Sequence, residues 1–160
     1  MMIAGPALVD WARLGTVSKE ELGASKIHTR NGSIDDEASS ETEAFSLAKQ
    51  FLSYLPSNVE QLPPRTACED PITRTAPELL DIIPRDPRKV YKMRKIINAV
   101  VDRGTFFEIG RQWGKSIITG LARIDGVATA VFAEDPMIYG GAWTADSCKK
   151  LIRLCDLASP

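Results

Sequence analysis

Apolar positions recur at helical spacing in the segment between Ser40 and Pro56. Ser40 has capping-box spacing to Glu43, and Pro56 cannot continue a helix. The apolar side chains between them, three and four residues apart, are Ala44, Phe45, Ala48, Phe51, Leu52 and Leu55. The pattern predicts an amphipathic helix whose apolar face lies in the core. A shorter helix is predicted from Ser18 and Glu21, with the same capping-box spacing, to about Gly23.

A further helix is predicted over residues 90–101, with Gly104 placed to end it. Its expected buried stripe consists of Met93, Ile96, Ile97, Val100 and Val101. The opposite side carries Lys89, Lys92, Arg94 and Lys95. We interpret this basic side as a solvated face, with a site for an anionic cofactor as the less favoured alternative.

The pattern changes after residue 115. Residues 116–124 and 127–133 are apolar and rich in β-branched side chains, and Asp125-Gly126 joins them, which is typical of a β-hairpin. Because both runs are nearly continuous, we expect strands covered on both faces. A glycine-rich loop over 136–143 follows. Thr144 or Asp146 then caps a last helix through Cys148, Leu151, Ile152, Leu154 and Cys155.

Prolines at positions 56, 63, 64, 71, 77, 84 and 87 interrupt the middle of the chain. So many prolines leave little room for regular elements, which predicts an extended connector between two domains. Leu79, Leu80, Ile82 and Ile83 indicate that this connector docks on the rest of the protein.

Composition narrows the possible functions. The chain has 160 residues, a net charge of -1 and 44% hydrophobic residues, enough for a modest core. The near-zero charge disfavours nucleic acid as a partner, and no apolar run is long enough to favour a membrane. The apolar start, residues 1–9, lacks the positive flank of a signal peptide, which favours the cytoplasm or an organelle matrix.

Few residues suggest side-chain chemistry. Cys68, Cys148 and Cys155 fit no disulfide or zinc pattern, so we expect three reduced, mostly buried thiols and no metal. The single histidine, His28, has no evident partner for catalysis, and a structural hydrogen bond is its expected role. Asp35-Asp36-Glu37 is expected to be a solvated loop. Ser33 and Ser116 lack the nucleophile-elbow motif of serine hydrolases.

Stretches along the whole chain nevertheless resemble one family, the carboxyltransferase β subunits of biotin-dependent acyl-CoA carboxylases, such as those acting on propionyl-CoA and methylcrotonyl-CoA. The order and spacing of the stretches make the resemblance specific. Ala24, Glu134 and the position of Gly32 depart from the family pattern, which leaves the subfamily and the acyl group open. The matching stretches are Met2-Ile3-Ala4-Gly5-Pro6, Glu21-Leu22-Gly23 with His28-Thr29, Phe51-Leu52-Ser53-Tyr54-Leu55-Pro56, Ile83-Pro84 with Tyr91, Val101-Asp102 with Phe106-Phe107-Glu108, Gly120-Leu121-Ala122-Arg123 with Asp125-Gly126, Gly140-Gly141-Ala142, and Arg153-Leu154-Cys155-Asp156.

The resemblance implies an incomplete crotonase-like α/β fold, built of strand-strand-helix units behind a helical N-terminal block. Residues 1–56 would be the tail of the acyl-CoA-side domain, 57–88 the interdomain linker, and 89–160 the start of the biotin-side domain. Family members run beyond both ends of this sequence. The parts expected there hold the two oxyanion loops, so we expect the chain alone to be inactive.

The implied reaction transfers a carboxyl group from carboxybiotin, carried on a partner, to an acyl-CoA. Negative charge develops on the biotin ureido oxygen and on the thioester enolate, where backbone amides can stabilise it. The comparable feature in this chain is the loop Tyr139, Gly140, Gly141 and Ala142, which would line a biotin-side pocket with Tyr139 or Trp143 as its apolar wall. The alternative, a purely structural turn, is the more common role of such glycines.

The expected partners are an acyl-CoA, a biotin carboxylase or biotin carrier subunit, and further copies of the carboxyltransferase subunit. Two other functions remain open. The same fold could serve a biotin-dependent decarboxylase, since nothing in these residues fixes the direction of transfer. A non-catalytic assembly module is the third possibility, because strand edges left unpaired would favour association.

Overall fold

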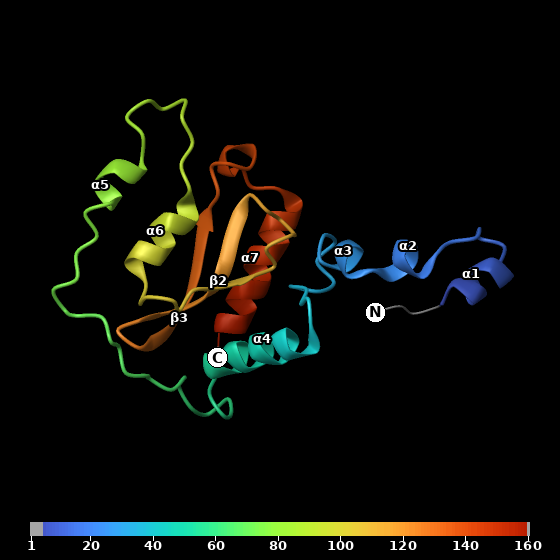
Figure 1. Ribbon diagram of the computed structural model, residues 1–160, viewed down its shortest axis with the longest axis horizontal. Helices are drawn as coiled ribbons and strands as arrows, with labels where there is room; N and C mark the ends of the chain where they lie inside the picture. The colour runs from blue at the N-terminus through green and yellow to red at the C-terminus, as the bar shows by residue number, and fades with distance from the viewer. Residues whose placement is uncertain (1–4, 160) are drawn as a thin grey trace.

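The computed structural model describes residues 5–159, which form helices at both ends and a small sheet between them (Figure 1). The stretch Met2-Ile3-Ala4 of the family resemblance lies outside these residues. The helices are α1 (Pro6–Trp11), α2 (Lys19–Gly23), α3 (Ser25–His28), α4 (Glu41–Ser53), α5 (Leu79–Ile82), α6 (Met93–Val100) and α7 (Ala145–Ala158). The strands are β1 (Phe107–Ile109), β2 (Ile117–Ile124) and β3 (Val127–Glu134), and a 3-10 turn, η1, covers Tyr139–Gly141.

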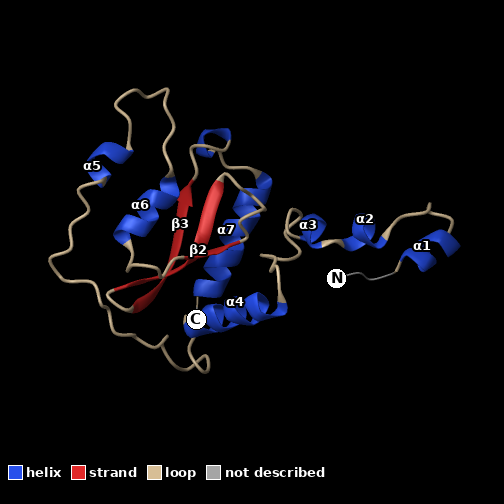
Figure 2. Ribbon diagram, viewed as in Figure 1, coloured by secondary structure: helices blue, strands red, loops and turns tan. Residues whose placement is uncertain are grey.

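The three strands form an antiparallel sheet in the order β1-β2-β3, with α6 and α7 packed against it (Figure 2). Helix α6 buries Ile97 against Ile118 and Ala122 of β2, which is the centre of the core. Helix α7 lies against β2 and β3 and buries Leu154. Every residue of β2 except Ile124 is buried, which confirms that this strand is covered on both faces.

The prediction of two covered faces is wrong for β3. This strand lies at an edge of the sheet, and its exposure alternates so that Val127 and Phe132 are about half exposed. The hairpin itself is confirmed, since Asp125 and Gly126 both have positive φ, 51° and 75°, as a two-residue type I′ turn requires. Strand β1 was not predicted, because a strand of three residues is too short to show an alternating pattern.

Helix α4 forms where the capping signal predicts it, with the Ser40 hydroxyl accepting the Glu43 N–H. Its predicted burial is wrong, because the helix contains no buried residue and Phe45 and Leu52 are about 60% exposed. The helix lies beside the sheet and contacts it at one end. There Phe51 approaches Phe107 of β1, with ring centroids 6.2 Å apart, and Tyr54 is buried just beyond the helix.

Helix α6 begins three residues later than predicted, at Met93, and Val100 faces solvent rather than the core. The solvated-face interpretation is wrong for Arg94. Its guanidinium lies against the sheet and pairs with two carboxylates, whereas Lys89, Lys92 and Lys95 are exposed. Long-range pairing decides this position, which the local charge pattern cannot show.

The proline-rich connector is docked, as predicted, but mainly through polar contacts. Thr66 N–H donates to the Gly126 carbonyl at 3.0 Å, and the Arg74 guanidinium donates to the Val101 carbonyl at 2.9 Å. Leu80 and Ile83, two of the apolar residues expected to hold it, are largely exposed. The connector therefore follows the hairpin and the end of α6.

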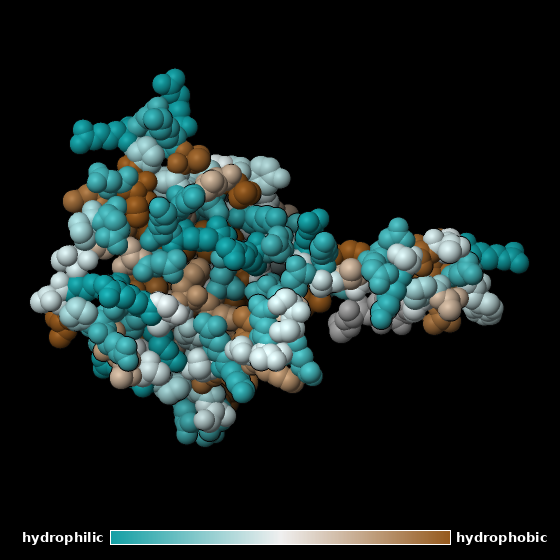
Figure 3. Space-filling view, viewed as in Figure 1, coloured by the Kyte–Doolittle hydropathy of each residue, from teal (hydrophilic) through white to brown (hydrophobic). Residues whose placement is uncertain are grey.

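Helices α1, α2 and α3 extend away from the sheet as an arm (Figure 1). Leu8, Trp11 and Leu14 of this arm are each more than half exposed. Figure 3 shows apolar side chains among polar ones on the surface of the arm. The Ser18 capping box that starts α2 is confirmed in both of its hydrogen bonds. None of the helices within residues 5–159 has both the length and the apolar character needed to cross a bilayer.

Candidate functional site

The loop after β3 adopts a strained backbone that explains its glycines. Tyr139, Gly140 and Gly141 have φ values of 51°, 64° and 80°, in a region of backbone conformation that residues with a Cβ rarely adopt. A Cβ on Gly141 would also lie 3.1 Å from the Cβ of Glu134, whereas one on Gly140 would meet nothing within 4 Å. Gly141 therefore has a structural role, and the backbone at Gly140 is open to an approaching group.

An open pocket of about 550 Å³ lies beside this loop. Of the four predicted site residues, Tyr139 lines the pocket, while Gly140, Gly141 and Ala142 shape the loop behind it. Trp143, the other expected wall, instead donates its ring N–H to Glu134 at 2.7 Å. The lining is Gly114, Lys115, Ser116, Met137, Ile138, Tyr139, Thr144 and Asp146.

Ser116 is the most unusual group in the pocket lining. Its side chain is 1% exposed, and among residues 5–159 its hydroxyl finds no hydrogen-bond partner. A buried hydroxyl without a hydrogen-bond partner is costly, so it calls for an explanation. Sequence reasoning missed this residue, because its burial and its lack of a partner depend on the surrounding fold.

The N-terminus of α7 lies against the same pocket. Thr144 caps the helix by accepting the Ser147 N–H, as predicted, and a Cβ on Gly114 would lie only 3.0 Å from the Ser147 backbone. The N–H groups of Ala145 and Asp146, in the first turn, have no partner within a helix. The pocket therefore combines hydrogen-bond donors with one cation, Lys115, and one carboxylate, Asp146.

Arg94 fixes the start of the loop. It donates to Glu108 at 2.9 and 2.6 Å and to Asp135 at 2.6 Å, and both carboxylates are largely buried. Hydrogen bonding to Glu108 is the largest of the effects that raise the pKa of Arg94. The Asp135 carboxylate in turn accepts the Met137 N–H at 3.1 Å, and the Asp135 N–H donates to the Ser116 carbonyl at 2.8 Å. One guanidinium thus connects α6, β1 and the loop that carries Tyr139.

Two predictions about polar residues in the N-terminal block are wrong. Both ring nitrogens of His28 are buried without a partner in the described part of the chain, so the expected side-chain hydrogen bond is not formed. The His28 carbonyl instead accepts the N–H groups of Ser33 and Ile34. Asp35 is not simply solvated, since it pairs with Arg153 of α7 at 3.0 Å, while Asp36 and Glu37 are exposed as expected.

The three cysteines are free thiols, but the prediction that most are buried is wrong. Cys155 is exposed, and Cys68 and Cys148 are half-buried. Cys68 lies in the connector, near Asp70 and Asp102, and the ligand atoms of these three residues lie within 4.8 Å of one another. The carboxylates already accept hydrogen bonds from Arg74, Arg103, Asp125 and Gly126. The group therefore acts as a junction between the connector and the hairpin.

The chain matches known proteins along essentially its whole length. The family model described as the carboxyl transferase domain matches residues 1–159. The propionyl-CoA carboxylase beta chain of Roseobacter denitrificans is 34% identical over 98% of this chain, and the human mitochondrial beta chain is also 34% identical. The methylmalonyl-CoA decarboxylase subunit alpha of Propionigenium modestum is 32% identical. The chain covers 31%, 30% and 31% of these relatives, about a third of their length.

Solved structures agree with these matches. Transcarboxylase 12S, in a structure described as a hexamer assembly with hydrolysed methylmalonyl-coenzyme A bound, superposes with a TM-score of 0.88 and 28% identity. That superposition covers 98% of this chain and 32% of the other. A single-chain long-chain acyl-CoA carboxylase superposes with a TM-score of 0.77, and 97% of this chain covers 15% of it. The expected crotonase-like fold, in part, is confirmed, and the chain belongs to the carboxyl transferase domain family.

Proposed function

We propose that this chain is part of a carboxyltransferase subunit of a biotin-dependent acyl-CoA carboxylase. The observation that carries the proposal is the match over 98% of the chain to propionyl-CoA carboxylase beta chains. The subunit would move a carboxyl group from carboxybiotin, held on a biotin carrier, to the α-carbon of an acyl-CoA. A biotin carboxylase would supply the carboxybiotin, and copies of the subunit would assemble with one another. The expected compartment is the cytoplasm, or the mitochondrial matrix in a eukaryote.

Within this chain, the pocket beside Tyr139 is the proposed biotin-side surface. Two features suit a ureido ring with an apolar tail. Ser116, whose hydroxyl has no partner among the described residues, lines the pocket, and Met137, Ile138 and Tyr139 supply apolar contacts. Carboxybiotin supplies the activated carboxyl group, and this chain's donors would hold the ring and stabilise charge on its carbonyl oxygen.

A chimera tests the proposal at the level of the whole protein. The segment of the Roseobacter denitrificans beta chain that matches this chain would be replaced by residues 1–160. With its biotin carboxylase partner, the chimera is expected to carboxylate an acyl-CoA. A chimera that folds and assembles like the parent but transfers no carboxyl group to any acyl-CoA from two to sixteen carbons would contradict the proposal.

The Tyr139 loop is tested in the same chimera. Tyr139 is 80% exposed, so Tyr139→Ala should fold normally. It is expected to raise the KM for free biotin derivatives about fivefold, the value of one aromatic contact, without changing the KM for acyl-CoA. Phe45→Ala, at an aromatic residue 58% exposed on α4, is the matched control. Equal effects of the two variants would argue against a biotin-side pocket at this loop.

The decarboxylase alternative is favoured by one observation, the 32% identity to the methylmalonyl-CoA decarboxylase subunit of Propionigenium modestum. Genomic neighbours distinguish the two directions. A biotin carboxylase gene next to the coding sequence supports the carboxylase, and a gene for a membrane sodium pump supports the decarboxylase.

A further inference from the structure

Helix α7 carries a buried lysine that the proposed function does not use. Lys150 is 4% exposed, and its Nζ donates to the Ile117 carbonyl at 2.7 Å. Gly110, at a φ of 66°, makes room for the side chain, since a Cβ there would lie 3.2 Å from Cε of Lys150. An ammonium group has three donors, and Ile117 is the one acceptor it reaches among residues 5–159.

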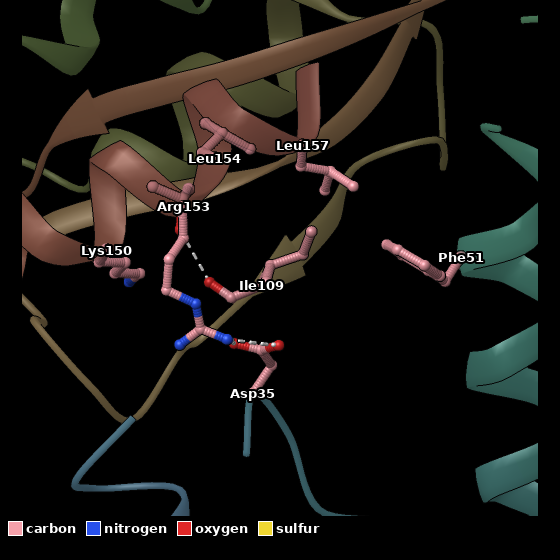
Figure 4. Close-up of a pocket in the computed structure, with 8 residues that line it drawn as sticks. Asp35, Phe51, Ile109, Lys150, Arg153, Leu154 and Leu157 are labelled. Atoms are coloured by element: carbon pink, nitrogen blue, oxygen red, sulfur yellow. Dashed lines mark hydrogen bonds and ion pairs between the residues drawn. The ribbon is translucent and has the colours of Figure 1, made fainter. Parts of the chain in front are cut away.

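The lysine lies at the side of a pocket of about 210 Å³, formed where α7 and β1 meet α4 and the loop before it. In Figure 4, Phe51 reaches in from α4 opposite Ile109 and Leu157, and Lys150 and Arg153 lie at the other end with Asp35. The pocket is therefore apolar at one end and charged at the other. The volume corresponds to roughly seven waters, or about as many non-hydrogen atoms of a ligand.

Most charges near Lys150 already have partners. Arg153 pairs with Asp35 at 3.0 Å and also donates to the Gly32 carbonyl. Glu108 of β1 and Asp135 pair with Arg94 of α6, and Glu108 also lies 3.6 Å from Arg111. The two cations Arg94 and Arg111 therefore balance the two anions Glu108 and Asp135. The charge of Lys150 is thus in excess, at the polar end of an otherwise apolar pocket.

We propose that this pocket binds a small amphipathic monocarboxylate, with its carboxylate on Lys150 and its alkyl chain along Phe51, Ile109, Leu154 and Leu157. A carboxylate would accept hydrogen bonds from the remaining ammonium donors, and it would also neutralise a buried charge. Both changes favour binding. Chains of about six carbons suit the volume. The site is separate from the Tyr139 loop, and it does not depend on the proposed carboxyl transfer.

Binding should depend on pH through Lys150. Burial, together with the positive charge of Arg94, lowers the pKa of this lysine to about 8. The negative charges of Glu108 and Asp35 oppose this shift. The ammonium is therefore mostly protonated at pH 7 and mostly neutral at pH 9.5. A bound carboxylate therefore loses its charged partner between pH 7 and pH 9.5, and its affinity falls. The affinity of a neutral ligand should stay the same over this pH range.

Calorimetric titration of the 160-residue chain with hexanoate, acetate and hexan-1-ol tests the site. Hexanoate is expected to bind at pH 7 at least about tenfold more tightly than either comparison ligand, since acetate lacks the apolar contacts and hexan-1-ol lacks the charge-assisted hydrogen bond. Its affinity should fall about tenfold between pH 7 and 9.5. Hexanoyl thioesters, which have no carboxylate, should bind no better than hexan-1-ol.

Matched variants test whether hexanoate binds at Lys150. Lys150→Met should reduce hexanoate affinity about tenfold or more, and Lys149→Met, at the exposed neighbour on the same helix, should leave it unchanged. If Lys150→Met does not fold, Leu157→Ala serves instead, with weaker binding of hexanoate and unchanged binding of acetate. The proposal is overturned if hexanoate shows no saturable binding, if it binds no better than hexan-1-ol, or if a folded Lys150→Met chain binds it equally well.

Discussion

Arg123 lies over the ring of Tyr54, with its guanidinium carbon 5.0 Å from the ring centre, and joins parts of the chain that are distant in sequence. Arg123 belongs to β2, and it donates to the carbonyls of Ser53 at 2.6 Å, Pro64 at 3.0 Å and Gly126 at 2.9 Å. Both side chains are buried. The end of α4, the connector and the hairpin therefore meet at one residue pair.

Arg123→Met should lower the free energy of unfolding by about 3 kcal/mol, because it removes the three hydrogen bonds that this buried guanidinium donates to the Ser53, Pro64 and Gly126 carbonyls. The measurement is urea denaturation followed by far-ultraviolet circular dichroism. Arg65→Met is the control, since Arg65 pairs with Asp125 on the surface and should change stability by less than about 1 kcal/mol. Equal losses in the two variants would show that Arg123 is not the junction described here.

Gly126→Ala should destabilise the chain by more than about 2 kcal/mol. Gly126 has a φ of 75°, and a Cβ there would overlap the Thr66 carbonyl oxygen, so the connector would have to move. Gly140 has a similar φ of 64°, but a Cβ there would meet nothing within 4 Å. Gly140→Ala should therefore cost only about 1 kcal/mol, from backbone strain. Denaturation measures both, and faster amide exchange at Thr66 in Gly126→Ala alone would identify the connector as the part that is released.

Asp102→Asn should weaken the hairpin in a pH-dependent way. The two carboxylate oxygens of Asp102 accept the N–H groups of Asp125 and Gly126 at 2.9 and 2.7 Å. Burial raises the pKa of Asp102, but these hydrogen bonds, together with the Cys68 thiol and the positive charge of Arg74, outweigh it, and the net pKa lies below the usual 3.8. The ionised carboxylate therefore stabilises the folded chain above about pH 4, and this contribution disappears as the pH falls through the lowered pKa.

The wild-type chain should accordingly exceed Asp102→Asn in stability by about 1 kcal/mol at pH 7, and the gap should narrow below about pH 4. Denaturation curves of both proteins between pH 7 and 2.5 measure this difference in the free energy of unfolding. Asp125→Asn, at the exposed turn position that asparagine also favours, should show no such gap. A gap that stays constant down to pH 2.5 would mean that the Asp102 charge does not hold the turn.

Arg94→Met should cost about 3 to 5 kcal/mol, because it leaves the buried carboxylates of Glu108 and Asp135 without their main partner. Arg111→Met, which removes a more exposed partner of Glu108, should cost less than about 1 kcal/mol. The measurement is again denaturation, with the intrinsic fluorescence of the chain as a second probe. Similar costs for both variants would show that the Arg94 contacts do not anchor the loop.

The candidate site could be predicted only in part. The sequence located the loop at Tyr139 and the cap at Thr144, because both follow from local glycine and capping preferences. It did not locate Ser116, Arg94 or Lys150. Their roles arise from burial and from partners that lie far away in the sequence, and residue type or spacing does not reveal such pairings.

The sequence by itself determined the elements whose stabilising contacts are short in range. The capping bonds of α2, α4 and α7 each join residues three positions apart, and the Asp125-Gly126 turn is equally local. The ordered stretches along the chain identified the family. Only the tertiary structure decided which apolar faces are buried, as the exposed side chains of α4 and β3 show. Burial depends on which elements pack together, and the contacts of Arg123 and Lys150 come from that packing rather than from their sequence neighbours.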